Sequence, residues 1–215
     1  MLRPIVFNEI FTILLVICLV LIALAKAFFP KRFNDFIYVL GNFRYLKVYA
    51  RDQKFIDGFD ALLFTNLLVS SAVFGSLIYK SFIGEVGDIY TLLIKLFVGI
   101  GVFALGKILI ERLIGSLFNI DALIDVYVFQ KMSYKNFLGF ILIPINAILI
   151  YRNVPTENIV QILVVFFVLI NCLGLVASYK SYQSLIKSNL FYFILYLCAL
   201  EISPYVILYK FFVNA

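Results

Sequence analysis

The amino-acid sequence predicts an all-α protein, a polytopic transmembrane helical bundle of about six spans with interfacial helices on the cytoplasmic side. The first reason is composition: 64% of the 215 residues are hydrophobic and 14% are charged, against roughly 45–50% and about 25% in soluble domains. The second is that the apolar residues form blocks of about 20, the length a helix needs to cross the ~30 Å hydrocarbon core of a bilayer. Most side chains are therefore expected to face lipid or other helices.

Six apolar blocks, all in one domain that covers residues 1–215, each predict one membrane span. In chain order they are residues 10–29, 61–79, 90–110, 136–151, 159–179 and 190–212. The fourth block is short for a helix that crosses the whole hydrocarbon core. Whether it crosses fully is left open by the sequence.

The lysine and arginine residues of the loops predict the orientation, because positively charged loops tend to stay in the cytoplasm. Eleven lie in the first, third and fifth loops: Lys31, Arg32, Arg44, Lys47, Arg51, Lys54, Arg112, Lys131, Lys135, Lys180 and Lys187. Four lie on the other side: Arg3, Lys80, Arg152 and Lys210. This split predicts that both termini face the periplasm.

The inner loops predict short helices at the membrane interface. After Pro30, which suits a first helical position, apolar residues recur at the spacing of one helical face as far as Gly41: Phe33, Phe36, Ile37 and Leu40. In the third loop, Asn119 can cap another helix that carries Asp121 and Asp125 on one face.

A basic face is predicted on a second short helix of the first loop. Arg44, Lys47, Arg51 and Lys54 step by three, four and three residues, which stacks four cations on one side. Interfacial anchoring among anionic lipids explains such a face, and docking of a partner or of a lipid phosphate is the alternative.

Glu201 lies near the middle of the last span, where an ionised side chain is expensive and is expected to face protein or water. Pro204 follows and frees backbone carbonyls at a similar depth. At about 1.5 Å per residue, Lys95 lies within side-chain reach of this depth and Lys107 does not. A structural Glu201–Lys95 pair or a protonated, hydrogen-bonded Glu201 is the favoured interpretation, and a transport or proton-coupling role is the alternative.

Three asparagines inside spans, Asn66, Asn146 and Asn171, can form hydrogen bonds between helices. Small residues would also let the second and third spans approach closely: Ser71, Gly75, Gly99, Gly101 and Gly106. We interpret both groups as helix packing.

Several classes of site are excluded by composition. The chain has no histidine, so it has no Ser-His or Cys-His catalytic pair and no imidazole metal ligand. Cys18, Cys172 and Cys198 lie far apart inside apolar blocks, where cysteine acts as a small hydrophobic residue. The net charge of +6 comes from basic residues beside apolar blocks, which suits anionic lipids and not nucleic acid. No cofactor and no catalytic residue are expected.

One motif resembles an enzyme signature. Asp57-Gly58-Phe59-Asp60-Ala61 resembles the start of the metal-binding signature of the CDP-alcohol phosphotransferases, membrane enzymes that make phospholipids. That signature continues with an arginine and two further aspartates, whereas Leu62 and an apolar span follow here. A lipid-head-group transferase is therefore the least favoured function. A turn that places Asp60 near the positive end of the next helix is the simpler interpretation.

Two segments resemble a family of multi-pass proteins from Bacteroidota, domain of unknown function 4271. The more distinctive is Phe-Tyr-Phe-Ile-Leu-Tyr-Leu-Cys-Ala-Leu-Glu-Ile-Ser-Pro at 191–204, and the other is Phe-Pro-Lys-Arg-Phe at 29–33. The resemblance implies a bacterial inner-membrane protein and supplies no catalytic residues. The segment 134–139, Tyr-Lys-Asn-Phe-Leu-Gly, leading to Pro144 is faintly similar to Yip1-type membrane proteins.

The sequence favours a non-enzymatic subunit or scaffold of a bacterial cell-envelope complex, such as one in protein export or surface assembly. Its outer loops are short, its spans carry few polar groups, and its polar inner loops suit contact with anionic membrane lipids and other membrane proteins. The alternative is a small secondary transporter or lipid-handling protein with Glu201 as the coupling carboxylate. Inverted repeats would support that alternative, and none is evident in the sequence.

Overall fold

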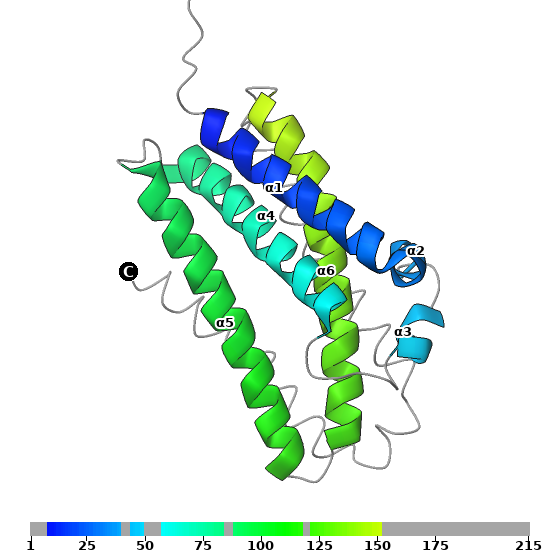
Figure 1. Cartoon of the computed structure of the whole chain (residues 1–215). Helices are drawn as coiled ribbons and strands as arrows, with labels where there is room; N and C mark the ends of the chain where they lie inside the picture. The colour runs from blue at the N-terminus through cyan, green and yellow to red at the C-terminus, as the bar shows by residue number, and fades with distance from the viewer. Residues whose placement is uncertain (1–7, 40–43, 50–56, 84–87, 118–120, 152–215) are drawn as a thin grey trace, which may run out of the picture.

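The structure is a computed structural model that describes residues 8–39, 44–49, 57–83, 88–117 and 121–151 (Figure 1). All regular elements in these ranges are α-helices. The spans expected at 159–179 and 190–212 lie outside the described residues, as do Asn119, Asn171, Glu201, Arg51 and Lys54.

Four of the described helices are long and apolar enough to cross a membrane. They are α1 (Asn8–Phe28), α4 (Gly58–Ile83), α5 (Ile89–Leu117) and α6 (Asp121–Tyr151). The apolar blocks at 10–29, 61–79, 90–110 and 136–151 fall within or nearly within them. The first four predicted spans are therefore found as helices.

α5 and α6 extend well past the predicted spans. α5 continues beyond residue 110 to Leu117, and α6 begins at Asp121, where a separate short helix was predicted. The prediction of a separate helix was wrong, because Asp121 and Asp125 lie on the same continuous helix as the fourth span. With 29 and 31 residues, the two helices are roughly 43 and 46 Å long, longer than the ~30 Å hydrocarbon core.

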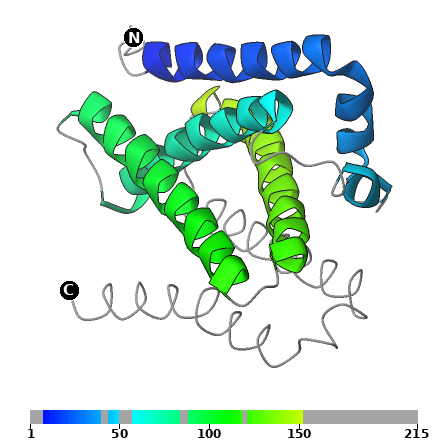
Figure 2. The ribbon, with the colours of Figure 1, turned by 60° about the horizontal axis from the view of Figure 1, so that its bottom comes forward.

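Two short helices follow α1. α2 (Pro30–Ile37) has its proline in the first turn, as the sequence predicted, and buries Phe33 and Phe36. α3 (Arg44–Tyr49) carries the first two residues of the predicted basic face. The two views show α2 turning sharply away from the axis of α1, with α3 beside it (Figures 1 and 2).

The long helices alternate in direction along the chain. The hydroxyls of Thr12 and Tyr151 lie 2.9 Å apart, which places the start of α1 beside the end of α6. At the other end, a Cβ added to Gly58 would lie 3.4 Å from the ring of Phe29, so the start of α4 adjoins the end of α1. We call this second end, which also holds α2, α3, the end of α5 and the start of α6, the α2 end (Figure 1).

α4 is the central helix and packs against α1, α5 and α6. The buried apolar side chains form one cluster at the α2 end, around Phe36, Leu63 and Phe137, and a second towards the opposite end, around Leu15, Val73 and Ile143. On α4, the buried polar residues Asn66 and Ser70 lie between Leu63 and Val73.

Glycines set two of the helix contacts. A Cβ added to Gly139 of α6 would lie 2.7 Å from the Cα of Leu67 in α4, so only glycine allows this approach. Between α4 and α5, Gly75 meets Leu96 and Gly101 meets Leu68. An added Cβ at Gly99 or Gly106 would meet nothing within 4 Å, so these two glycines do not pack against α4.

α5 begins directly after Asp88, whose carboxylate accepts hydrogen bonds from the backbone N–H of Tyr90 and the hydroxyl of Thr91. The bond from Thr91 is the main reason that the pKa of Asp88 lies below its usual value. A carboxylate here satisfies donors that the first helical turn leaves without partners.

The outward faces of α1 and α5 are lined by exposed apolar side chains. On α1 they include Ile13, Val16, Val20 and Leu24, and on α5 Ile94, Val98, Val102, Leu109 and Leu113. A soluble protein rarely exposes such continuous apolar surfaces. Contact with lipid or with other helices of a membrane bundle explains them.

Candidate functional site at the α2 end

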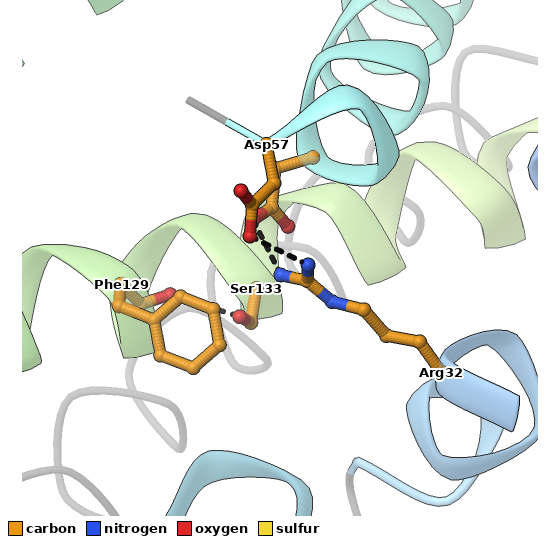
Figure 3. A network of polar contacts seen from close by, with 5 residues as sticks. Arg32, Asp57, Phe129 and Ser133 are labelled. Carbon is orange, nitrogen blue, oxygen red and sulfur yellow. Dashed lines mark hydrogen bonds and ion pairs between the residues drawn. The ribbon is translucent and has the colours of Figure 1, made fainter. Parts of the chain in front are cut away.

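A buried ion pair between one arginine and two aspartates lies at the α2 end (Figure 3). Arg32 of α2 donates from Nη1 to Oδ2 of Asp57 at 2.8 Å and from Nη2 to Oδ2 of Asp60 at 2.7 Å. The exposed fractions of the three side chains are 11%, 31% and 7%. We call these three residues the Arg32 centre.

The local fold explains why these residues meet. Asp57 immediately precedes α4 and Asp60 lies in its first turn, where the helix dipole favours negative charge. Arg32 lies in α2, one residue before the buried Phe33, and reaches across to the start of α4 (Figure 3). The Asp-Gly segment that resembled an enzyme signature therefore forms an ion pair with α2.

Aromatic side chains enclose the Arg32 centre. The guanidinium carbon of Arg32 lies 4.9 Å from the ring centroid of Phe59 and 5.2 Å from that of Tyr49, within cation–π range. The ring of Phe36 makes edge contacts with those of Tyr45, Phe59 and Phe137 at 5.7–5.9 Å. Helices α2, α3, α4 and α6 thus meet around one charged group.

The electrostatics keep the Arg32 centre charged. Burial alone would lower the pKa of Arg32, but the attraction of Asp60 and the hydrogen bond to Asp57 raise it above its usual value. Burial, helped by the negative charge of Asp60, also raises the pKa of Tyr45. At neutral pH the arginine is therefore ionised and the tyrosine neutral, so the centre acts as a fixed ionic clamp.

A second charged cluster joins α5 to α6 at the same end. Glu111 of α5 is fully buried and pairs with Lys131 of α6. Closer to the end of α5 and the start of α6, Nε of Arg112 lies 3.3 Å from Oδ1 of Asp125. Oε2 of Glu111 has no hydrogen-bond partner among the described residues. Charges that the sequence placed in a loop thus hold two long helices together.

The polar residues singled out within spans occupy different places. Asn146 donates from Nδ2 to the backbone oxygen of Ser70 at 2.9 Å, which links α6 to α4. Asn66 is fully buried, and within the described ranges both its amide atoms lack a partner. Lys95 is exposed on α5. Cys18 lies 3.4 Å from the hydroxyl of Ser70 and is buried.

Neither the Arg32 centre nor the Glu111–Lys131 pair was predicted from the sequence. Arg32 was predicted to lie in the positive loop and in the family-like segment 29–33, and Asp57 and Asp60 in a turn before a helix or in a truncated metal signature. None of these predictions paired Arg32 with the two aspartates. For Glu111, a signal was present: it follows Lys107 by four residues, so both lie on one side of a helix that continues past residue 110. Within the described ranges, no three acidic or cysteine residues gather as metal ligands would.

Comparison with known protein families matches residues 11–212, nearly the whole chain, to a family described as Domain of unknown function (DUF4271). Comparisons with curated proteins and with solved structures gave no match. The match includes α4, α5, α6 and all but the first three residues of α1, together with the Arg32 centre and the Glu111–Lys131 pair. The chain therefore belongs to the family of domain of unknown function 4271.

Proposed function

We propose that this protein is a non-enzymatic subunit or scaffold of a complex in the bacterial inner membrane, such as one that serves protein export or surface assembly. The observation that carries the proposal is the Arg32 centre, which fixes two short helices against the end of a membrane-like bundle.

A helix of eight residues is unstable by itself in water. α2 is held by the burial of Phe33 and Phe36 and by the bonds from Arg32 to α4. Buried ion pairs add little stability compared with apolar packing, but they can enforce one arrangement of the parts that they join. The clamp therefore supports a role in which the position of α2 matters.

The outward face of α2 is polar and carries both a positive and a negative side chain. Lys31, Asn34 and Asp35 are exposed, and the hydroxyl of Tyr49 from α3 donates to Asp35 at 3.0 Å. Tyr38, directly after the helix, is 68% exposed. A fixed polar surface with an exposed tyrosine suits contact with another protein.

Cross-linking and purification from the native membrane in mild detergent would test the scaffold. We expect wild-type protein to be isolated with a defined partner in constant ratio. The double variant Lys31→Glu, Asn34→Arg should lose this partner at unchanged membrane abundance. The control Glu9→Arg changes an exposed residue at the opposite end and should retain it. A wild-type chain that is isolated alone after cross-linking would contradict the proposal.

A second candidate function, a small secondary transporter, is supported by Glu111. It is fully buried in α5, within a helix long enough to cross a membrane, and one of its oxygens has no partner among the described residues. Buried carboxylates inside spans often serve in proton or ion coupling. Under this alternative, Glu111 joins Glu201 as a possible coupling group.

A further inference from the structure

One exposed face of α5 combines a charge with small residues. Lys95, Gly99, Val102 and Gly106 follow one another at intervals of four, three and four residues, so they share one side of the helix. Lys95 and Gly99 are exposed, and Val102 is 66% exposed. We call these four residues the Lys95 face.

The Lys95 face is poorly suited to lipid. A cation within an apolar span is expensive unless it reaches water or meets an opposite charge. No ion pair joins Lys95 to any described residue. Glycines on a helix surface leave a shallow groove, and in membranes such grooves are used for close helix contacts. Gly99 and Gly106 both open onto empty space on this face.

The chain itself contains a matching charge. Of its twelve acidic residues, Glu201 is the one that falls inside a predicted apolar block. Lys95 is six residues from the start of α5, roughly 9 Å at ~1.5 Å per residue. Glu201 is eleven residues before position 212, roughly 16 Å from that end of its block. The difference in depth is within the combined reach of a lysine and a glutamate side chain.

We propose that the Lys95 face is the docking surface for segment 190–212 of the same chain, held by an ion pair between Lys95 and Glu201. With six spans that alternate in direction, this segment runs antiparallel to α5. When the ion pair brings Lys95 and Glu201 to the same level, Cys198, three residues before Glu201, lies beside Gly99, four residues after Lys95. This inference does not depend on the proposed function.

A disulfide cross-link would test the register. The full chain carries Gly99→Cys and keeps Cys198, while Cys18 and Cys172 become alanine. After oxidation in the membrane, the protein is denatured and treated with a polymer that carries a maleimide. Each free thiol that reacts adds one polymer and so one shift in electrophoretic mobility. We expect both thiols to be protected, the protein to remain a monomer, and reduction to restore two shifts.

The matched control is Ile94→Cys in the same background. Ile94 is also exposed, at 64%, but lies about 140° around the helix from Gly99 at roughly 100° per residue. In the Ile94→Cys protein, the cysteine at position 94 and Cys198 should both stay reactive. Equal reactivity of the Gly99→Cys and Ile94→Cys proteins would overturn the proposal. A cross-linked dimer through Gly99→Cys would also overturn it, by assigning the face to a second copy.

A charge exchange tests the ion pair without a new thiol. Lys95→Glu and Glu201→Lys should each lower membrane abundance severalfold, because each places two like charges together. The double exchange should restore it to near the wild-type level. If the membrane abundance of the double variant, relative to the wild type, equals the product of the relative abundances of the two single variants, Lys95 and Glu201 do not interact.

Discussion

Arg32 makes contacts that a lysine could not make together. Its two terminal nitrogens reach Asp57 and Asp60 separately, while its planar group lies near the rings of Phe59 and Tyr49. A lysine ammonium is a compact point charge without this flat fork. The identity of residue 32 should therefore matter as much as its charge.

Arg32→Ala should destabilise the protein by about 3 kcal/mol, because it leaves the buried Asp60 and the half-buried Asp57 without their counter-charge. Arg32→Lys should fall between the alanine variant and the wild type. The measurement is unfolding of the purified protein in detergent. Lys31→Ala, next to it but exposed, should change stability by less than about 0.5 kcal/mol. Equal stability of Arg32→Ala and Lys31→Ala would show that the clamp is unimportant.

Glutamine variants of Glu111 and Glu201 distinguish the two proposed functions, scaffold and transporter. In a scaffold, Glu111→Gln keeps size and hydrogen bonding, so complementation of a deletion strain should survive, and Glu201→Gln should behave likewise. In a coupled transporter, one of the two glutamine variants should accumulate normally in the membrane yet fail to complement. Membrane abundance and complementation, measured together, give the answer.

At the scale of the helix, the closest contact is between α4 and α6. A methyl group at residue 139 would lie 2.7 Å from the Cα of Leu67, and backbone cannot move aside as a side chain can. Gly139→Ala should therefore force the two helices apart and cost about 1–3 kcal/mol. In Gly101→Ala, the new methyl lies 3.5 Å from the end of Leu68, so this control should be mild. Thermal unfolding in detergent compares the two.

The basic face predicted for Arg44, Lys47, Arg51 and Lys54 should act through its summed charge. Single changes to glutamine should be mild, whereas the quadruple change should lower the amount of anionic lipid that is purified with the protein. The effect should weaken as salt is raised, because salt screens the attraction between basic side chains and anionic headgroups. Lys80→Gln, at the opposite end, is the control. Lipid retention that ignores both salt and the quadruple change would contradict this prediction.

For the whole molecule, the eleven-to-four distribution of basic residues predicts that the α2 end faces the cytoplasm and both termini face the periplasm. Single cysteines at Asn34 and Asn214, in a chain without the native cysteines, would be treated with an impermeant thiol reagent in intact spheroplasts. We expect labelling at 214 and, at 34, only after the membrane is broken. The reverse pattern would invert the orientation.

The sequence predicted the four described spans because burial in lipid depends on composition, which can be read locally. It also predicted α2, where Pro30 and the spacing of Phe33 and Phe36 agree. It failed where charges are neutralised by distant partners. Glu111 and Arg112 appeared to end α5, yet Lys131 and Asp125 of α6 pair with them, so both helices continue. Arg32 likewise meets residues 25 and 28 positions away, a pairing that local spacing does not encode.

The ion pair between Arg32 and Asp57 joins two residues 25 positions apart and so closes the intervening chain into a ring. One end of this ring lies in α2 and the other directly before α4. Closure entropy grows only with the logarithm of ring length, so even doubling the length costs about 0.6 kcal/mol. Insertions between Tyr49 and Asp57 can therefore change the surface at the α2 end at almost no cost in stability. What this surface binds can then diverge while the fold stays the same.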